Sequence, residues 1–134
     1  MKRIPLNIVA AALYQRLTKH QTVAVYDDIP PDAEAPYISF GLFTCKGDGT
    51  KTNDICNVTA NIDIWSDYAG KKEVNEISND IITLVMATLL DLSNDKFLHL
   101  ASEVDFFESF PEEDVNGYHG VITFLFKIQN MEEQ

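Results

Sequence analysis

Residues 71–92 read KKEVNEISNDIITLVMATLLDL, and this stretch decides the fold that we expect. Apolar residues recur every three or four positions, which is typical of a helix with one buried face. That face is expected to hold Val74, Ile77, Ile81, Leu84, Val85, Thr88 and Leu92. Charged and amide side chains lie on the opposite side, beginning with Lys71 and Lys72. A helix of this kind needs a covering surface, and the sequence around it supplies strands.

Length and composition predict one folded domain over residues 1–134. The chain of 134 residues can form one core, and its 46% apolar content argues against disorder. The formal net charge of −11 disfavours binding to nucleic acid or to anionic membranes, because both are polyanions. No apolar run approaches the roughly 20 residues of a membrane span, so we expect no contact with a membrane.

The negative charge is concentrated in the last third of the chain, where only Lys96 and Lys127 oppose it. The acidic residues there are Asp91, Asp95, Glu103, Asp105, Glu108, Glu112, Glu113, Asp114, Glu132 and Glu133. A solvated face that keeps the protein soluble is the simplest interpretation. The alternative is a surface that repels DNA or meets a basic partner.

Strand patterns surround two helical patterns. A first helix is expected at residues 5–17, followed by β-prone runs at residues 23–26, 37–44, 55–65, 97–107 and 118–128. The order α-β-β-β-α-β-β predicts an α+β fold, with two helices packed on one face of an antiparallel β-sheet.

The alternation within each strand predicts which side chains face the core. In residues 55–65 these are Cys56, Val58, Ala60, Ile62 and Ile64. In residues 97–107 they are Leu98, Leu100, Val104 and Phe106, although the pattern there is less regular. The last strand is apolar on both faces, because Val121 and Leu125 lie opposite Ile122 and Phe124. Such a strand is either central to a two-sided core or half of a subunit contact, so Val121 and Leu125 are candidate interface residues.

A long polar loop is expected between the second and third of these strands. Its residues are Lys46, Gly47, Asp48, Gly49, Thr50, Lys51, Thr52, Asn53 and Asp54. Their spacing does not match a phosphate-binding loop. Long loops in compact domains are either functional or simple connections. We take this loop as a candidate partner-binding segment that is mobile in the free protein.

The sequence lacks recognisable catalytic and metal-binding patterns, so we expect neither an enzyme nor a cofactor. Cys45 and Cys56 have no zinc-site spacing, and two free thiols are favoured over a bridge for a protein made in a reducing compartment. A metal-dependent hydrolase that uses His99 and His119 is a minor alternative, because the remaining ligands are missing.

Several short motifs, taken in order, resemble one protein family. ALYQRL at 12–17, VYDDIP at 25–30 and APYI at 35–38 precede the polar loop, and NIDIWS at 61–66 and EVNEI at 73–77 follow it. Together with residues 120–128, this series resembles the tail completion, or tail-to-head joining, proteins of long-tailed bacteriophages. In length and sequence the chain is similar to members from Bacillus phages. Thr22 and Ala24 depart from the pattern, since the family often has a basic residue there.

The resemblance implies a structural virion protein, made in the host cytoplasm and placed at the head-proximal end of the tail. The implied partners are the tail-tube protein and the head-connector (stopper) protein. It also implies self-association into a ring, usually hexameric, through which DNA passes. An acidic wall suits such passage, because it does not hold phosphates. From the residues alone, a small acidic adaptor that binds a basic protein remains the alternative.

Overall fold

The computed structural model describes residues 1–132, so that Glu133 and Gln134 lie outside the described residues. Its helices and strands are α1 (Leu6–His20), β1 (Ala24–Tyr26), β2 (Tyr37–Gly47), β3 (Ile55–Ser66), α2 (Lys72–Met86), β4 (Phe97–Glu112) and β5 (Gly117–Asn130). Two short 3₁₀ turns, η1 (Ser93–Asp95) and η2 (Glu113–Val115), precede β4 and β5. The predicted α+β class and the order of elements are confirmed.

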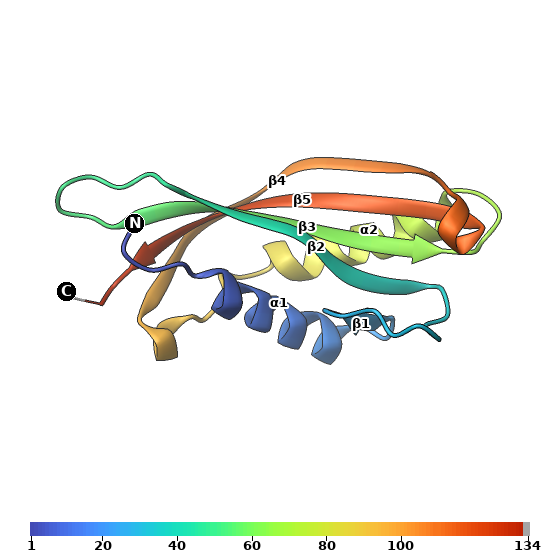
Figure 1. Cartoon of the computed structure of the whole chain (residues 1–134), viewed down its shortest axis with the longest axis horizontal. Coiled ribbons are helices and arrows are strands. Elements are labelled where there is room, and N and C mark those ends of the chain that lie inside the picture. The colour runs from blue at the N-terminus through green and yellow to red at the C-terminus, as the bar shows by residue number, and fades with distance from the viewer. Residues whose placement is uncertain (133–134) are drawn as a thin grey trace.

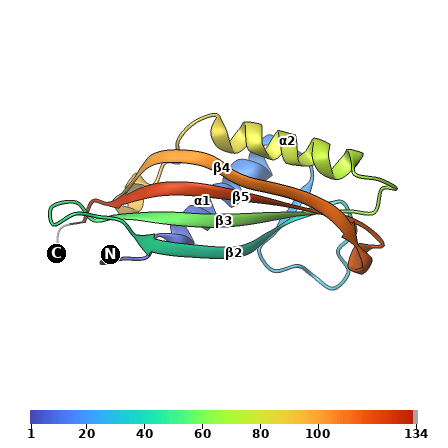
Figure 2. The ribbon, with the colours of Figure 1, turned by 90° about the horizontal axis from the view of Figure 1, so that it is seen from above.

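The strands form one sheet in the order β1-β2-β3-β5-β4, and Figure 2 shows the four long strands side by side. All neighbouring pairs are antiparallel except β1 and β2, which run parallel. The parallel pair differs from the fully antiparallel expectation. The proline-containing connection between them carries the chain back to the end where β1 began, so β2 starts in the same direction.

Both helices lie on one side of the sheet, as Figure 1 shows, and they cover what we call its inner face. The inner face of β3 carries the alternate residues that the sequence predicted, from Cys56 to Ile64, and all of them are buried. β5 adds Ile122, Phe124, Phe126 and Ile128. From the helices, Leu13 and Ile81 are fully buried in the same cluster. The opposite side is called the outer face.

The second helix is shorter than predicted, because it ends at Met86 instead of Leu92. Thr88 is exposed. Leu90 and Leu92 are buried although they lie in a non-helical segment, and this explains why the apolar pattern of the sequence continues past the end of the helix. The guanidinium group of Arg16 in α1 donates hydrogen bonds to the carbonyl oxygens of Val85, at 3.2 Å, and Thr88, at 2.8 Å. These bonds satisfy carbonyl groups that have no partner at a helix end.

The predicted core side of β4 is largely wrong. Leu98, Leu100 and Phe106 are exposed, and only Val104 of the predicted set packs against the core. The reason is a pair of register irregularities, between His99 and Ala101 and between Val104 and Phe106. Each extra residue reverses the alternation, so the inner residues are Phe97, His99, Val104 and Phe107.

Candidate functional site

The predicted polar loop lies at the tip of the β2–β3 hairpin, at the end of the molecule that also holds the N-terminus (Figure 1). It is shorter than expected, because Lys46 and Gly47 belong to β2 and pair with Asn57 and Cys56. Residues 48–54 form the connection, which we call the hairpin loop. All of its residues except Asp54 are exposed.

The hairpin loop has a defined turn. The backbone N–H of Asp48 donates to the carbonyl of Ile55 at 2.8 Å, and that of Thr50 donates to the carbonyl of Asn53 at 2.9 Å. The hydroxyl oxygen of Thr50 accepts from the backbone N–H of Asn53 at 3.2 Å. A Cβ atom on Gly49 would contact the backbone of Asn53 and lie 2.9 Å from the nitrogen of Ile55. The turn therefore requires glycine at position 49.

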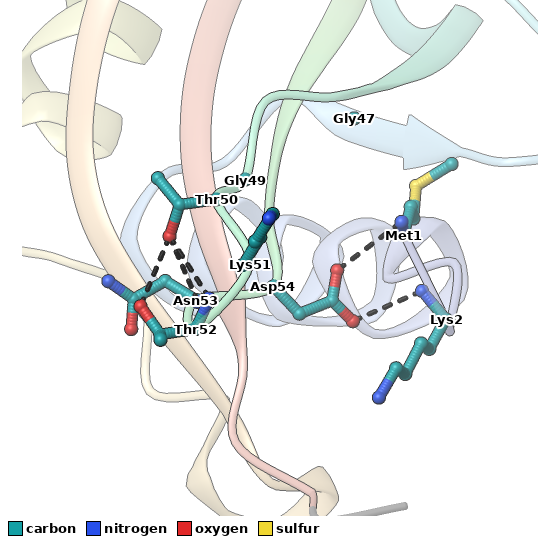
Figure 3. Close-up of a pocket in the computed structure, with 9 residues that line it drawn as sticks. All are labelled: Met1, Lys2, Gly47, Gly49, Thr50, Lys51, Thr52, Asn53 and Asp54. Carbon is teal, nitrogen blue, oxygen red and sulfur yellow. Dashed lines mark hydrogen bonds and ion pairs between the residues drawn. The ribbon is translucent and has the colours of Figure 1, made fainter.

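Asp54 fixes the base of the hairpin loop. Its carboxylate lies 3.5 Å from the N-terminal ammonium group of Met1 and accepts a 3.1 Å hydrogen bond from the backbone N–H of Lys2, as Figure 3 shows. The amide of Asn130 in β5 donates a third contact at 2.9 Å. This hydrogen bond is the main reason that the pKa of Asp54 is lowered. The loop and the first two residues together line an open pocket of about 350 Å³.

Arg3 joins the same end of the sheet to β4. Its guanidinium donates to the side-chain oxygen of Asn130 at 2.7 Å and to the carbonyl of Lys96 at 2.9 Å. It also pairs with Glu132 at 3.1 Å and lies 3.9 Å from the ring centre of Phe97. The chain start, the hairpin loop and the end of β5 are thus one connected polar cluster. Beyond this base, the hydrogen bonds of residues 49–53 stay within that segment.

Two exposed lysines lie in and beside the hairpin loop of this acidic chain. Lys46 and Lys51 are exposed, and neither takes part in an ion pair among residues 1–132. Asp48 differs, because its carboxylate accepts from the amide of Asn57 at 3.0 Å and lies 3.8 Å from the ammonium group of Lys127. The two lysines are therefore available to an acidic surface.

The candidate interface residues Val121 and Leu125 lie on the outer face of β5 and are half-buried. Val121 is opposite Asp63 on one side and Glu108 on the other. Leu125 is opposite Thr59 and Glu103. The outer face is therefore mixed in character, with apolar side chains between polar and acidic ones. This arrangement suits an interface that is solvated in the free protein.

His119 and His99 do not form a common site. His119 lies on the outer face, where its ring stacks on Trp65 at 3.8 Å and its Nε2 is 2.8 Å from the carboxylate of Asp63. His99 lies on the inner face of β4. Among residues 1–132, no group of three or more potential metal ligands is brought together. The metal-hydrolase alternative therefore loses the histidine pair on which it depended.

His99 has a structural environment. Its Nδ1 accepts a hydrogen bond from the backbone N–H of Leu90 at 2.8 Å, and its Nε2 lies 3.0 Å from the carbonyl of Ala101 and 2.7 Å from the hydroxyl of Ser102. Burial lowers the pKa of His99, and the charge of Arg16 adds to that effect. An accepting Nδ1 and a lowered pKa together favour the neutral imidazole ring. Its hydrogen bond with Leu90 holds the segment after α2 against β4.

Cys45 and Cys56 are free thiols at the base of the same hairpin. Cys56 is buried, as expected, whereas Cys45 is half-exposed. Burial, and secondarily the neighbouring Cys45, raises the pKa of Cys56 to about 12. Its thiolate form is thus suppressed, and the residue behaves as a small apolar side chain.

The polar cluster around Asp54 and Arg3 was missed by sequence reasoning. Its members are far apart in the chain, because Asp54 and Asn130 differ by 76 in residue number and Arg3 and Asn130 differ by 127. The sequence near Asn130 shows only a polar residue just after an apolar strand pattern. That arrangement is too common to identify a polar cluster. Pairing of β3 with β5 is needed to bring these residues together.

Known structures share this architecture. A chain from the virion of a native gene transfer agent particle matches with a TM-score of 0.77 and 21% identity, covering 89% of this chain and 92% of that chain. The gp17 protein of bacteriophage SPP1 matches with a TM-score of 0.62 and 18% identity, covering 98% and 96%. No curated protein sequence matches. The fold is thus one that also occurs in a protein of an assembled particle.

The family follows from the sequence itself. The model of the family described as "Tail completion protein gp17" matches residues 11–129, which is most of the chain. The chain belongs to this family, and the resemblance seen in its motifs is confirmed. It is a structural protein of phage tails. Within residues 1–132, no helix combines the length and apolar character needed to cross a membrane.

Proposed function

We propose that this protein occupies the head-proximal end of the tail, where it completes the tail tube and joins it to the head connector. The observation that carries the proposal is the match of the tail completion family to residues 11–129. The likeness to a chain from a gene transfer agent virion supports a place inside an assembled particle. In this proposal the protein acts as a ring of identical copies around the DNA channel.

The hairpin loop supplies the proposed contact to a neighbouring protein of the tail. It projects from one end of the sheet and carries Lys51, with Lys46 in the adjoining strand. An acidic surface on the tail-tube protein or the head-connector (stopper) protein would attract the charge of Lys51. The remaining surface is strongly acidic, and a channel wall of that character would let DNA slide past without retaining it.

Deletion of the gene from a phage that carries it tests the proposal. The expected lysate contains DNA-filled heads and separate, complete-length tails that do not join. Supplying the protein from a plasmid should restore joined particles. Gold-labelled antibody should mark the head-proximal end of isolated tails. Normal joined particles from the deletion phage, or label only at the distal tip, would overturn the proposal.

The same experiment decides the adaptor alternative. An acidic adaptor for a basic host protein would be absent from purified particles, and its deletion would leave the joining of heads and tails intact. If the protein is present in washed tails and its deletion prevents the joining of heads and tails, the adaptor alternative is excluded.

A further inference from the structure

The sheet has two open edges. On one side, β1 pairs with β2 only up to Ser39, so residues 40–47 have no neighbouring strand on that side among residues 1–132. On the other side, β4 is the last strand of the sheet. Open edges present unpaired backbone N–H and C=O groups, which readily pair with another chain. We propose that these two edges bind each other between copies of the protein, so that β4 of one copy pairs with residues 40–47 of the next.

The directions of the strands fit this contact. β2, β3, β5 and β4 are antiparallel in succession, so β4 runs opposite to β2 within one molecule. A second copy placed beside the first in the same orientation therefore brings its β2 antiparallel to β4 of the first. Every copy then presents the same outer face and the same hairpin loop. Such a head-to-tail contact repeats and closes into a ring when its rotation permits.

The side chains at the two edges are complementary in charge. The exposed edge of β4 carries Glu103, Asp105 and Glu108. The exposed part of β2 carries Lys46 and no acidic residue before Asp48. Contact between a basic and an acidic edge is favourable, whereas two β4 edges would repel each other. The charge pattern therefore selects the head-to-tail pairing over a symmetric β4–β4 pairing.

An exposed apolar side chain marks each edge. Leu42 is 67% exposed and lies in the register irregularity of β2 between Phe40 and Phe43. Phe106 is 55% exposed and lies at the end of the register irregularity of β4 that begins after Val104. In an antiparallel register with Leu42 opposite Phe106, and with Asp105 as the extra residue of the irregularity, Lys46 lies opposite Ala101 and diagonal to Glu103 on the outer face. Diagonal neighbours lie within reach of a long side chain. One register thus covers both apolar groups and pairs the opposite charges.

The same irregularities explain why the edges need not associate in solution. Bulges and charged side chains are devices that protect edge strands from indiscriminate pairing. Exposed ion pairs contribute little, and every copy carries a net charge of −11. A template such as a tail end would supply the high local concentration that aligns the two edges.

Photo-cross-linking in assembled tails tests the contact directly. A photoreactive amino acid at Leu42 should give a covalent dimer of this chain, with the cross-link mapped by mass spectrometry to residues 101–108 of a second copy. The same group at Thr83, on the exposed face of α2, should give no such dimer. Cross-links from Leu42 that reach only a different protein, or a different part of this chain, would overturn the proposal.

Charge exchange provides an independent test in infected cells. Lys46→Glu and Glu103→Lys should each lower the titre of infectious particles at least tenfold, and the double variant should recover most of the loss. Glu76→Lys on α2 makes the same charge change as Glu103→Lys away from both edges and should have no effect. Unchanged melting temperatures show that the variants fold. A double variant no better than the single ones would refute the edge contact.

The inference rests on the proposed ring, but the two can fail separately. If the protein is needed for joining and labels the head-proximal end, yet gives no cross-link from Leu42 to β4, only the edge contact is wrong. If the deletion phage joins heads and tails normally, the joining function itself is wrong.

Discussion

The amide of Asn130 donates a 2.9 Å hydrogen bond to the carboxylate of Asp54, and so ties the last strand to the end of the hairpin loop. Asp54→Ala removes this contact and those to Met1 and Lys2. We expect a loss of about 1 kcal/mol in the free energy of unfolding, measured by urea denaturation. No change in stability would mean that the base of the loop is solvated rather than held.

The lowered pKa of Asp54 gives this contact a pH dependence. Because the folded pKa lies below the unfolded one, the stabilisation is present above about pH 4 and is lost as the pH falls further. Asp54→Asn should therefore flatten the decline in stability between about pH 5 and pH 2. Asp67→Asn, at an exposed position, should leave the curve unchanged.

His99 should contribute a second, separate pH dependence. Its folded pKa is lowered, mainly by burial, so the unfolded chain takes up a proton at a higher pH than the folded chain does. The stabilisation is complete above about pH 6.5 and is lost as the pH falls through that value. His99→Asn keeps an acceptor for Leu90 but cannot titrate, so its melting temperature should vary less between pH 7 and pH 5. His20→Gln, on an exposed residue, should retain the wild-type slope.

Ile81 tests the core between α2 and the sheet. Its side chain is fully buried, so Ile81→Asp places a carboxylate without a partner among apolar groups. The free energy of unfolding should fall by about 4 kcal/mol or more. Asn79→Asp, on the exposed side of the same helix, should change it by less than about 0.5 kcal/mol. Equal melting temperatures for the two variants would place Ile81 outside the core.

The hairpin loop should be mobile before assembly and required during it. We expect low backbone order parameters, below about 0.6, for residues 49–53 in the free protein, because they bond only within their own segment. Ordering them costs about 1–2 kcal/mol per residue, which contacts with a partner must offset.

Deletion of residues 47–53 should accordingly leave the fold intact and block the joining of tails to heads. Lys46 is then bonded directly to Asp54, and the connection between the paired residues Lys46 and Asn57 is short enough for a tight hairpin. In a milder test, Lys51→Glu should reduce joining, whereas Lys72→Glu at the opposite end of the molecule should not. A normal titre from the deletion would make the loop a simple connection.

The isolated protein should be monomeric or weakly associated. Copies with a net charge of −11 repel one another, and the edge contact alone is too weak to overcome that repulsion without a tail end. Sedimentation velocity at micromolar concentration should give one species of 15.1 kDa. A stable hexamer without any tail protein would contradict this expectation.

The sequence predicted those features that depend on periodicity alone. The alternation in β3 and the stripe from Val74 to Val85 are strict, so the architecture and most core residues could be identified. The same reasoning was wrong for β4, because the extra residue at each register irregularity interrupts the alternation. His99 therefore lies on the inner face, and Leu98 is exposed on the outer face. No local composition marks such a position in advance.

The polar contacts were beyond sequence reasoning for a different reason. The end of α2 depends on Arg16, whose acceptor at Val85 is 69 positions away. The base of the loop depends on Asp54 and Asn130, which meet only when β3 and β5 pair. The loop itself was located correctly apart from its first two residues, whereas its proposed contact with a partner awaits experiment.

β5 comes last in sequence among the five strands of the sheet, yet it lies between β3 and β4. β5 pairs with β3 on one side and β4 on the other, so neither neighbour can complete its hydrogen bonds until β5 has left the ribosome. Translation thus delays closure of this core until β5 has been made. A nascent chain without β5 lacks the finished sheet that the proposed contact between edges requires.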